Sequence, residues 1–99
     1  MLHIVNKSPF EKCTLESCLR IARPGHALLL IEDGVYAAVR GNAFESRIRQ
    51  VAATMRVYAL GPDLAARGMK TAAIDGIELV DYAGFVDLVA THDTVQSWL

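Results

Sequence analysis

The segment HALLLIE, at residues 26–32, constrains the fold more than any other part of the chain, because its interior is continuously apolar and follows a Pro24-Gly25 breaker. Such a run is too short for a buried helix and is typical of a strand covered on both faces, as in a parallel sheet. Three further apolar segments, LHIV at 2–5, RVYAL at 56–60 and IELV at 77–80, predict additional strands. The chain therefore needs helices on both faces of a sheet.

Helical patterns separate these strands. The first predicted helix carries Leu15, Cys18, Leu19 and Ala22 on one face and starts either at Ser8, in a capping-box pattern with Pro9 and Glu11, or at Thr14. Further helices are predicted at 35–39, 43–53 and 63–67. Asp81 is expected to cap a last helix with an apolar stripe formed by Tyr82, Phe85, Val86 and Val89. This alternation predicts a three-layer α/β/α fold with a mostly parallel sheet of four to five strands.

Composition limits the class of protein. Ninety-nine residues, 53% of them hydrophobic, suit one domain over residues 1–99. With ten basic and eleven acidic side chains spread along the chain, we expect no charged surface for direct contact with nucleic acid or an anionic membrane. No apolar run approaches the roughly 20 residues of a membrane span, and the N-terminal segment lacks the features of a signal peptide. We therefore expect a cytoplasmic protein.

The two cysteines, Cys13 and Cys18, lie within the segment KCTLESCLR. Their spacing matches neither a zinc pattern nor a C-x-x-C redox pair, and on a helix the side chains would point about 140° apart, which favours free thiols. Periodicity makes Cys18 a small buried residue. The alternative is a partly exposed thiol near the carboxyl edge of the sheet, acidified by Lys12, Arg20 or a helix N-terminus. Cys13 is expected to be more exposed but inert, because no base accompanies it.

Other chemistry has little support in the sequence. The three histidines, His3, His26 and His92, follow no metal-ligand spacing, so we expect no metal. A glycine-rich phosphate loop is missing after the first predicted strand, and no nucleophile elbow is present, so we expect neither a nucleotide cofactor nor a serine hydrolase. The pair Glu32-Asp33 is either a paired-carboxylate site or, as is more common, a solvated turn before Gly34.

Several blocks of sequence occur together in a known order: LHIVNKSPFE, LESCL, LLLIEDGVYAA, VYALGPDLAARG, VDYAGFVDLV and QSWL. In these blocks the chain resembles the DsrH/TusB family of small sulfur-relay subunits, from Leu2 to Leu99. The resemblance implies a DsrE-like fold and a heterohexamer with two copies each of three related subunits. These are called DsrE, DsrF and DsrH in sulfur oxidisers, and TusD, TusC and TusB in tRNA thiolation.

The resemblance also implies the chemistry, which is transfer of persulfide sulfur between cysteines without a cofactor, in the cytoplasm. The main sulfur-carrying cysteine of such complexes is on the DsrE- or TusD-like partner. The cysteine of LESCL in the DsrH-like branch maps onto Cys18, which is thus a candidate persulfide carrier and favours sulfur oxidation. The alternatives are a subunit for 2-thiolation of the tRNA wobble uridine and a purely structural subunit without sulfur on its own cysteines.

The partners that the resemblance implies are the DsrE/TusD-like and DsrF/TusC-like subunits and a downstream sulfur acceptor. A chain this apolar is expected to expose a patch for its sister subunits. Trp98 together with the helix of Tyr82 and Phe85 is a candidate anchor for them. The alternative is that Trp98 folds back onto its own core.

Overall fold

The computed structural model describes residues 1–98, which form a five-stranded sheet in the order β4-β3-β2-β1-β5. The strands are β1 (Leu2–Val5), β2 (Ala27–Leu30), β3 (Arg56–Leu60), β4 (Glu78–Val80) and β5 (Val95–Trp98). All four pairings are parallel. The predicted α/β fold with a mostly parallel sheet is confirmed, and the sheet contains the larger of the two predicted numbers of strands.

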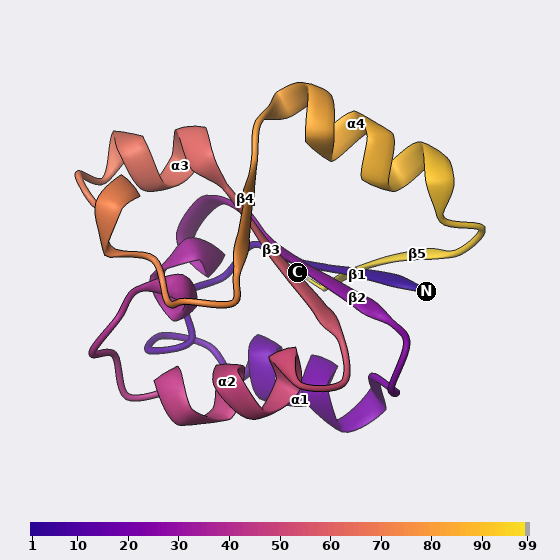
Figure 1. Cartoon of the computed structure of the whole chain (residues 1–99). Coiled ribbons are helices and arrows are strands. Elements are labelled where there is room, and N and C mark those ends of the chain that lie inside the picture. The colour runs from indigo at the N-terminus through magenta and orange to yellow at the C-terminus, as the bar shows by residue number, and fades with distance from the viewer. Residues whose placement is uncertain (99) are drawn as a thin grey trace.

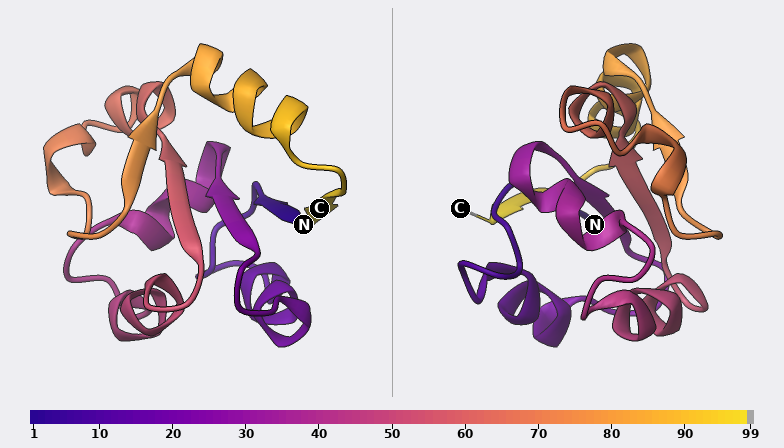
Figure 2. Two further views of the ribbon diagram at one scale, coloured as in Figure 1. Left: turned by 45° about the vertical axis from the view of Figure 1, so that its right-hand side comes forward. Right: turned by 90° about the vertical axis from the view of Figure 1, so that its left-hand side faces the viewer.

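The helices form a layer on each side of the sheet (Figure 1). The helices α1 (Thr14–Ile21) and α2 (Glu45–Ala52) cover one face, and α4 (Tyr82–Thr91) crosses the other. Short elements follow the carboxyl ends of β2 and β3: the 3-10 helix η1 (Glu32–Ala38), the helix α3 (Gly61–Ala66) and the 3-10 helix η2 (Lys70–Ala72). Both views in Figure 2 keep α4 on the opposite side of the sheet from α1 and α2.

The sheet divides the core into two clusters. Its α1/α2 face contributes Val5, Leu28, Leu30, Val57 and Ala59, which pack with residues such as Leu15, Cys18 and Ile48. Its α4 face contributes Leu2, Ile4, Ala27, Leu29 and Tyr58, which pack with Phe85 and Leu88. All four residues of β2 are buried, so the continuous apolar run at 27–30 is a strand covered on both faces, as predicted.

The first helix starts at Thr14, which is the second of the two predicted starts. The carbonyl oxygen of Ser8 accepts hydrogen bonds from the backbone N–H groups of Glu11 and Lys12, and its hydroxyl accepts one from Phe10 N–H. These bonds close a turn rather than a helix. At α4 the predicted cap is confirmed, because the Asp81 carboxylate accepts a hydrogen bond of 2.8 Å from Gly84 N–H.

One glycine holds η1 against the end of β1. Gly34 is buried, and a Cβ atom at this position would overlap the carbonyl oxygen of Val5. That oxygen accepts a hydrogen bond from Ile31 N–H, so it cannot move without loss of the pairing between β1 and β2. Only a residue without a side chain fits this position.

We therefore predict that Gly34→Ala lowers the free energy of unfolding by about 1–3 kcal/mol, the usual cost of overpacking a core. Urea denaturation followed by circular dichroism measures it. Gly61→Ala is the matched control, because a Cβ atom there would lie at an ordinary 3.4 Å from the Val80 carbonyl oxygen. Equal stability of the two variants would contradict the steric role of Gly34.

Candidate functional site

Cys18, the candidate persulfide carrier, lies in the middle of α1 on the side that faces the sheet. Its side chain is fully buried in the larger core cluster, together with Val5, Leu15 and Leu30. Burial raises the pKa of the Cys18 thiol to about 12, because the thiolate would lose its hydration. The two cations proposed to acidify it, Lys12 and Arg20, are exposed. This geometry favours a buried, protonated thiol over a reactive one.

Cys13 lies just before α1 and is exposed. Both cysteines are free thiols, as the spacing predicted. Neither is therefore held in a disulfide, and only Cys13 is accessible from solvent.

The carboxylates at the end of β2 form a turn with the end of β3. Glu32 has a positive φ of 50°, and its backbone N–H donates a 2.6 Å hydrogen bond to the Asp63 carboxylate. Asp33 forms an ion pair of 2.7 Å with Arg67. Hydrogen bonding to Asp33 raises the pKa of Arg67, so the guanidinium stays charged. The exposed pair Glu32-Asp33 is thus used in turn contacts, which favours the turn interpretation over paired-carboxylate catalysis.

Two histidines and the single tryptophan form a hydrogen-bonded chain that the sequence did not predict. Trp98 Nε1 donates to His3 Nδ1 over 3.1 Å, and His3 Nε2 lies 3.0 Å from His26 Nδ1. The backbone N–H of Arg23 also donates to His26 Nδ1, over 3.2 Å. Since both of these Nδ1 atoms accept, each ring is neutral and carries its proton on Nε2. The fully buried His3 ring therefore joins β5 to the start of β2.

The hydrogen bond from Trp98 to His3 also fixes the position of the Trp98 side chain. Its indole packs against the core cluster on the α1/α2 face, whereas α4 lies on the other face. The proposed anchor of Trp98 together with Tyr82 and Phe85 is therefore wrong, because alternate residues of a strand point to opposite faces and Trp98 shares its face with Val5. The alternative, in which Trp98 folds back onto its own core, is the one observed.

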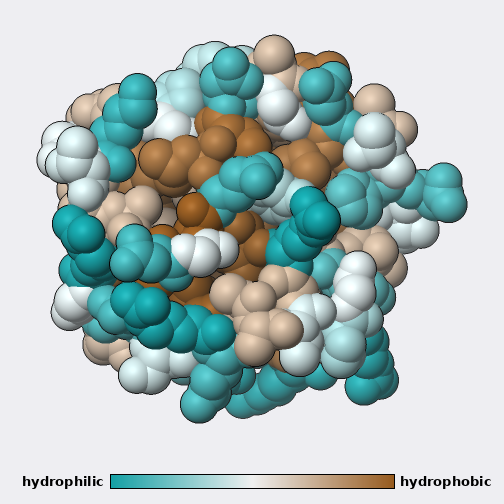
Figure 3. All heavy atoms as spheres, viewed as in Figure 1, coloured by the Kyte–Doolittle hydropathy of each residue, from teal (hydrophilic) through white to brown (hydrophobic). Residues whose placement is uncertain are grey.

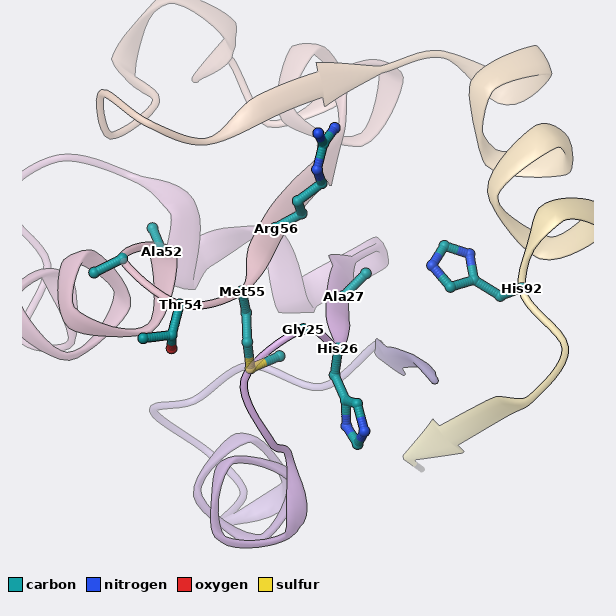
Figure 4. Close-up of a pocket in the computed structure, with 9 residues that line it drawn as sticks. Gly25, His26, Ala27, Ala52, Thr54, Met55, Arg56 and His92 are labelled. Atoms are coloured by element: carbon teal, nitrogen blue, oxygen red, sulfur yellow. The ribbon is translucent and has the colours of Figure 1, made fainter.

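A surface hollow of about 530 Å³ lies beside the amino ends of β2 and β3 (Figure 4). Its lining includes His26, Thr54, Arg56 and His92. Figure 4 shows the Arg56 and His26 side chains extending in opposite directions, so they do not converge on one point. Within residues 1–98, no group of three or more His, Cys, Asp or Glu side chains is placed to hold a metal ion. The hollow thus lacks a convergent set of polar groups.

Three exposed large hydrophobic side chains, Tyr82, Val86 and Val89, lie on α4. None of its ten residues is buried, and Tyr82 and Val86 are 61% and 65% exposed. A shallow depression on this helix is lined by Tyr82, Phe85, Val86, Val89 and Ala90, which we call the α4 patch. Figure 3 shows hydrophobic residues at the surface along α4 and beside β4. No helix within residues 1–98 is long and apolar enough to cross a membrane.

The histidine chain predicts a pH dependence. Burial, followed by the nearby His26 and the N-terminal amino group, lowers the pKa of His3 below its ordinary value of 6.5. The unfolded chain therefore binds a proton more readily than the folded one, so stability is complete above about pH 6.5 and falls as the pH decreases. Protonation also turns Nδ1 into a donor, which breaks the bond from Trp98.

We expect the urea concentration at the unfolding midpoint of the wild type to decrease as the pH is lowered from 7.5 to 5.5. The fluorescence of Trp98 should change over the same range. His3→Gln removes the titration of His3 and should make both curves flatter over this range, with the remaining slope due to His26, whose pKa is also lowered by burial. Parallel pH curves for the two proteins would show that His3 does not control the acid sensitivity.

Comparisons with known proteins agree with this structure. The family model described as "DsrH like protein" matches residues 7–95. Protein TusB of Escherichia coli K12 is 40% identical over 98 residues, covering 99% of this chain and 100% of that protein. Protein TusB of Shigella flexneri is 39% identical over the same length.

Two solved structures share the fold. The crystal structure of the ychN protein from Escherichia coli has a TM-score of 0.85 and 22% identity, covering 98% of this chain and 97% of that one. The protein MTH1491 from Methanobacterium thermoautotrophicum, whose function is unknown, has a TM-score of 0.74 and 17% identity over 97% and 95% of the two chains. With a family model and relatives that match along almost its whole length, the chain belongs to the DsrH/TusB family.

Proposed function

We propose that this protein is a cytoplasmic sulfur-relay subunit that works within a complex and serves there as a structural, partner-binding component. The observation that carries the proposal is the family membership, with 40% identity to a TusB protein along 99% of the chain. The sister subunits of the DsrE/TusD and DsrF/TusC type, and the acceptor beyond them, belong to the proposal.

The buried position of Cys18 supports a structural role over direct transport of sulfur. A persulfide on Cys18 would add a sulfur atom inside a close-packed core, next to Leu15 and the sheet. Attack on a donor would also require a thiolate, which burial disfavours. The alternative, in which α1 opens and Cys18 carries sulfur, requires Cys18 to leave the core.

We predict that a persulfide donor adds sulfur to the DsrE/TusD-like subunit but not to this chain. Intact-mass spectrometry of the protein, alone and with both sister subunits, measures the added sulfur on each chain. Cys18→Ala is preferred to serine, because it removes the thiol without burying a hydroxyl group.

Cys13→Ser is the matched control for adventitious modification of an exposed thiol. Sulfur on this chain that persists in Cys13→Ser and disappears in Cys18→Ala would make Cys18 a relay thiol and refute the structural role. Failure of both sister subunits to bind the wild-type chain would refute membership of such a complex.

The branch of the family forms a second part of the proposal. The similarity to TusB proteins favours tRNA wobble-uridine 2-thiolation. The cysteine in LESCL favours sulfur oxidation instead, but the burial of Cys18 weakens that argument. Although all ten Lys and Arg residues lie within residues 1–70, the net charge of the whole chain is −1, and we assign any contact with tRNA to a partner.

We predict that deletion of the gene strongly lowers the 2-thiouridine content of cellular tRNA. Nucleoside mass spectrometry measures it, and complementation with Cys18→Ala should restore it as fully as the wild type does. Unchanged 2-thiouridine together with a defect in sulfur oxidation would assign the protein to the other branch.

A further inference from the structure

The α4 patch lies on a helix that is apolar on two sides. Phe85 and Leu88 pack against the sheet, while Tyr82, Val86 and Val89 stay exposed on the outer side. Exposed side chains at positions 82, 86 and 89 follow helical spacing, so they form a continuous stripe rather than isolated residues. A continuous apolar stripe at the surface indicates a binding surface.

The charges of the C-terminal part of the chain, which carries this stripe, are not balanced, although Lys70 lines one hollow together with Asp81. All ten Lys and Arg residues lie within residues 1–70, whereas residues 71–99 contain five Asp and Glu and no Lys or Arg. The expectation that the charges are spread along the chain is therefore wrong for the basic residues. The small net charge of the whole chain conceals a basic and an acidic part. Asp81, Asp87 and Asp93 are exposed, and within residues 1–98 none of them forms a salt bridge.

This distribution argues against pairing of two α4 patches. A symmetric dimer would place the same helix against itself, so residues near the twofold axis meet their own copies. Such a dimer would bring two copies of α4, each with an exposed Asp87 and no Lys or Arg of its own, into one interface. Like charges that are brought together at an interface oppose association.

The basic part of the chain does not supply a matching surface either. Its most exposed large apolar residues are Phe10 and Ile21, at 55% and 56%. They lie before the first turn and at the last residue of α1, a helix about 12 Å long. Two apolar residues separated by the length of a helix cannot cover a continuous stripe.

We propose that the α4 patch binds a different protein chain through an apolar surface edged with Lys or Arg side chains. This inference rests on the proposed function, which supplies the sister subunits as the source of that chain. The apolar stripe provides the buried area, and Asp87 and Asp93 pair with the cations at its edge.

The test uses the full chain and its two sister subunits, with complex formation measured by native mass spectrometry and by titration. Val86→Asp should weaken binding by at least about tenfold, because it places a charge in the centre of the buried stripe. Asp87→Lys should weaken it less, and its effect should decrease at high salt. Ile21→Asp, on the α1/α2 side of the molecule, is the matched control and should bind like the wild type.

The possible results distinguish a failure of the inference from a failure of the proposed function. Wild-type affinity in both Val86→Asp and Asp87→Lys would overturn the inference and leave the proposed function standing. No binding of either sister subunit by the wild type would refute the proposed function, and the inference with it. A wild-type homodimer that Val86→Asp dissociates would identify a second copy as the partner and overturn the inference. Thermal melting of every variant controls for folding.

Discussion

The requirement that a parallel sheet be covered on both faces governs this structure. Helices α1 and α2 and the 3-10 helix η1 together cover one face of the sheet. The core cluster on that face includes fourteen buried residues. On the other face α4 is the main cover, and the cluster includes only five. The burial is therefore unequal, and the helix that covers the thinner side carries apolar residues on its outer surface as well. The α4 patch follows from this unequal covering.

The parts of the fold that the sequence predicted are those with a local apolar pattern. The strand at 27–30 and the strand at 56–60 were predicted because their buried residues are consecutive in sequence. The edge strand β5 was not singled out, because its residues VQSW are mostly exposed and show no apolar run. Its position depends on pairing with β1, at a separation of more than ninety residues. Local propensity carries no information about such a pairing.

The site residues show the same limit. Helical periodicity correctly placed Cys18 among Leu15 and the other core residues, but it did not say whether the nearby cations reach the sulfur. In the structure Lys12 and Arg20 are exposed to solvent. The pKa of the Cys18 thiol is therefore controlled by desolvation. His3 and Trp98 come together only through the register of β1 with β5. Their contact is a property of the sheet and of no sequence motif.

The histidine chain and the α4 patch lie on opposite faces of the same sheet and differ in the kind of contact they offer. An edge strand that is four residues long and mostly exposed has little apolar area to hold it in place. The bond from Trp98 to the buried His3 adds a directional contact at the end of that strand. On the other face, apolar area is abundant but lacks direction, since hydrophobic contact alone does not select an orientation. The proposed pairing of Asp87 and Asp93 with cations of a partner would supply that selection.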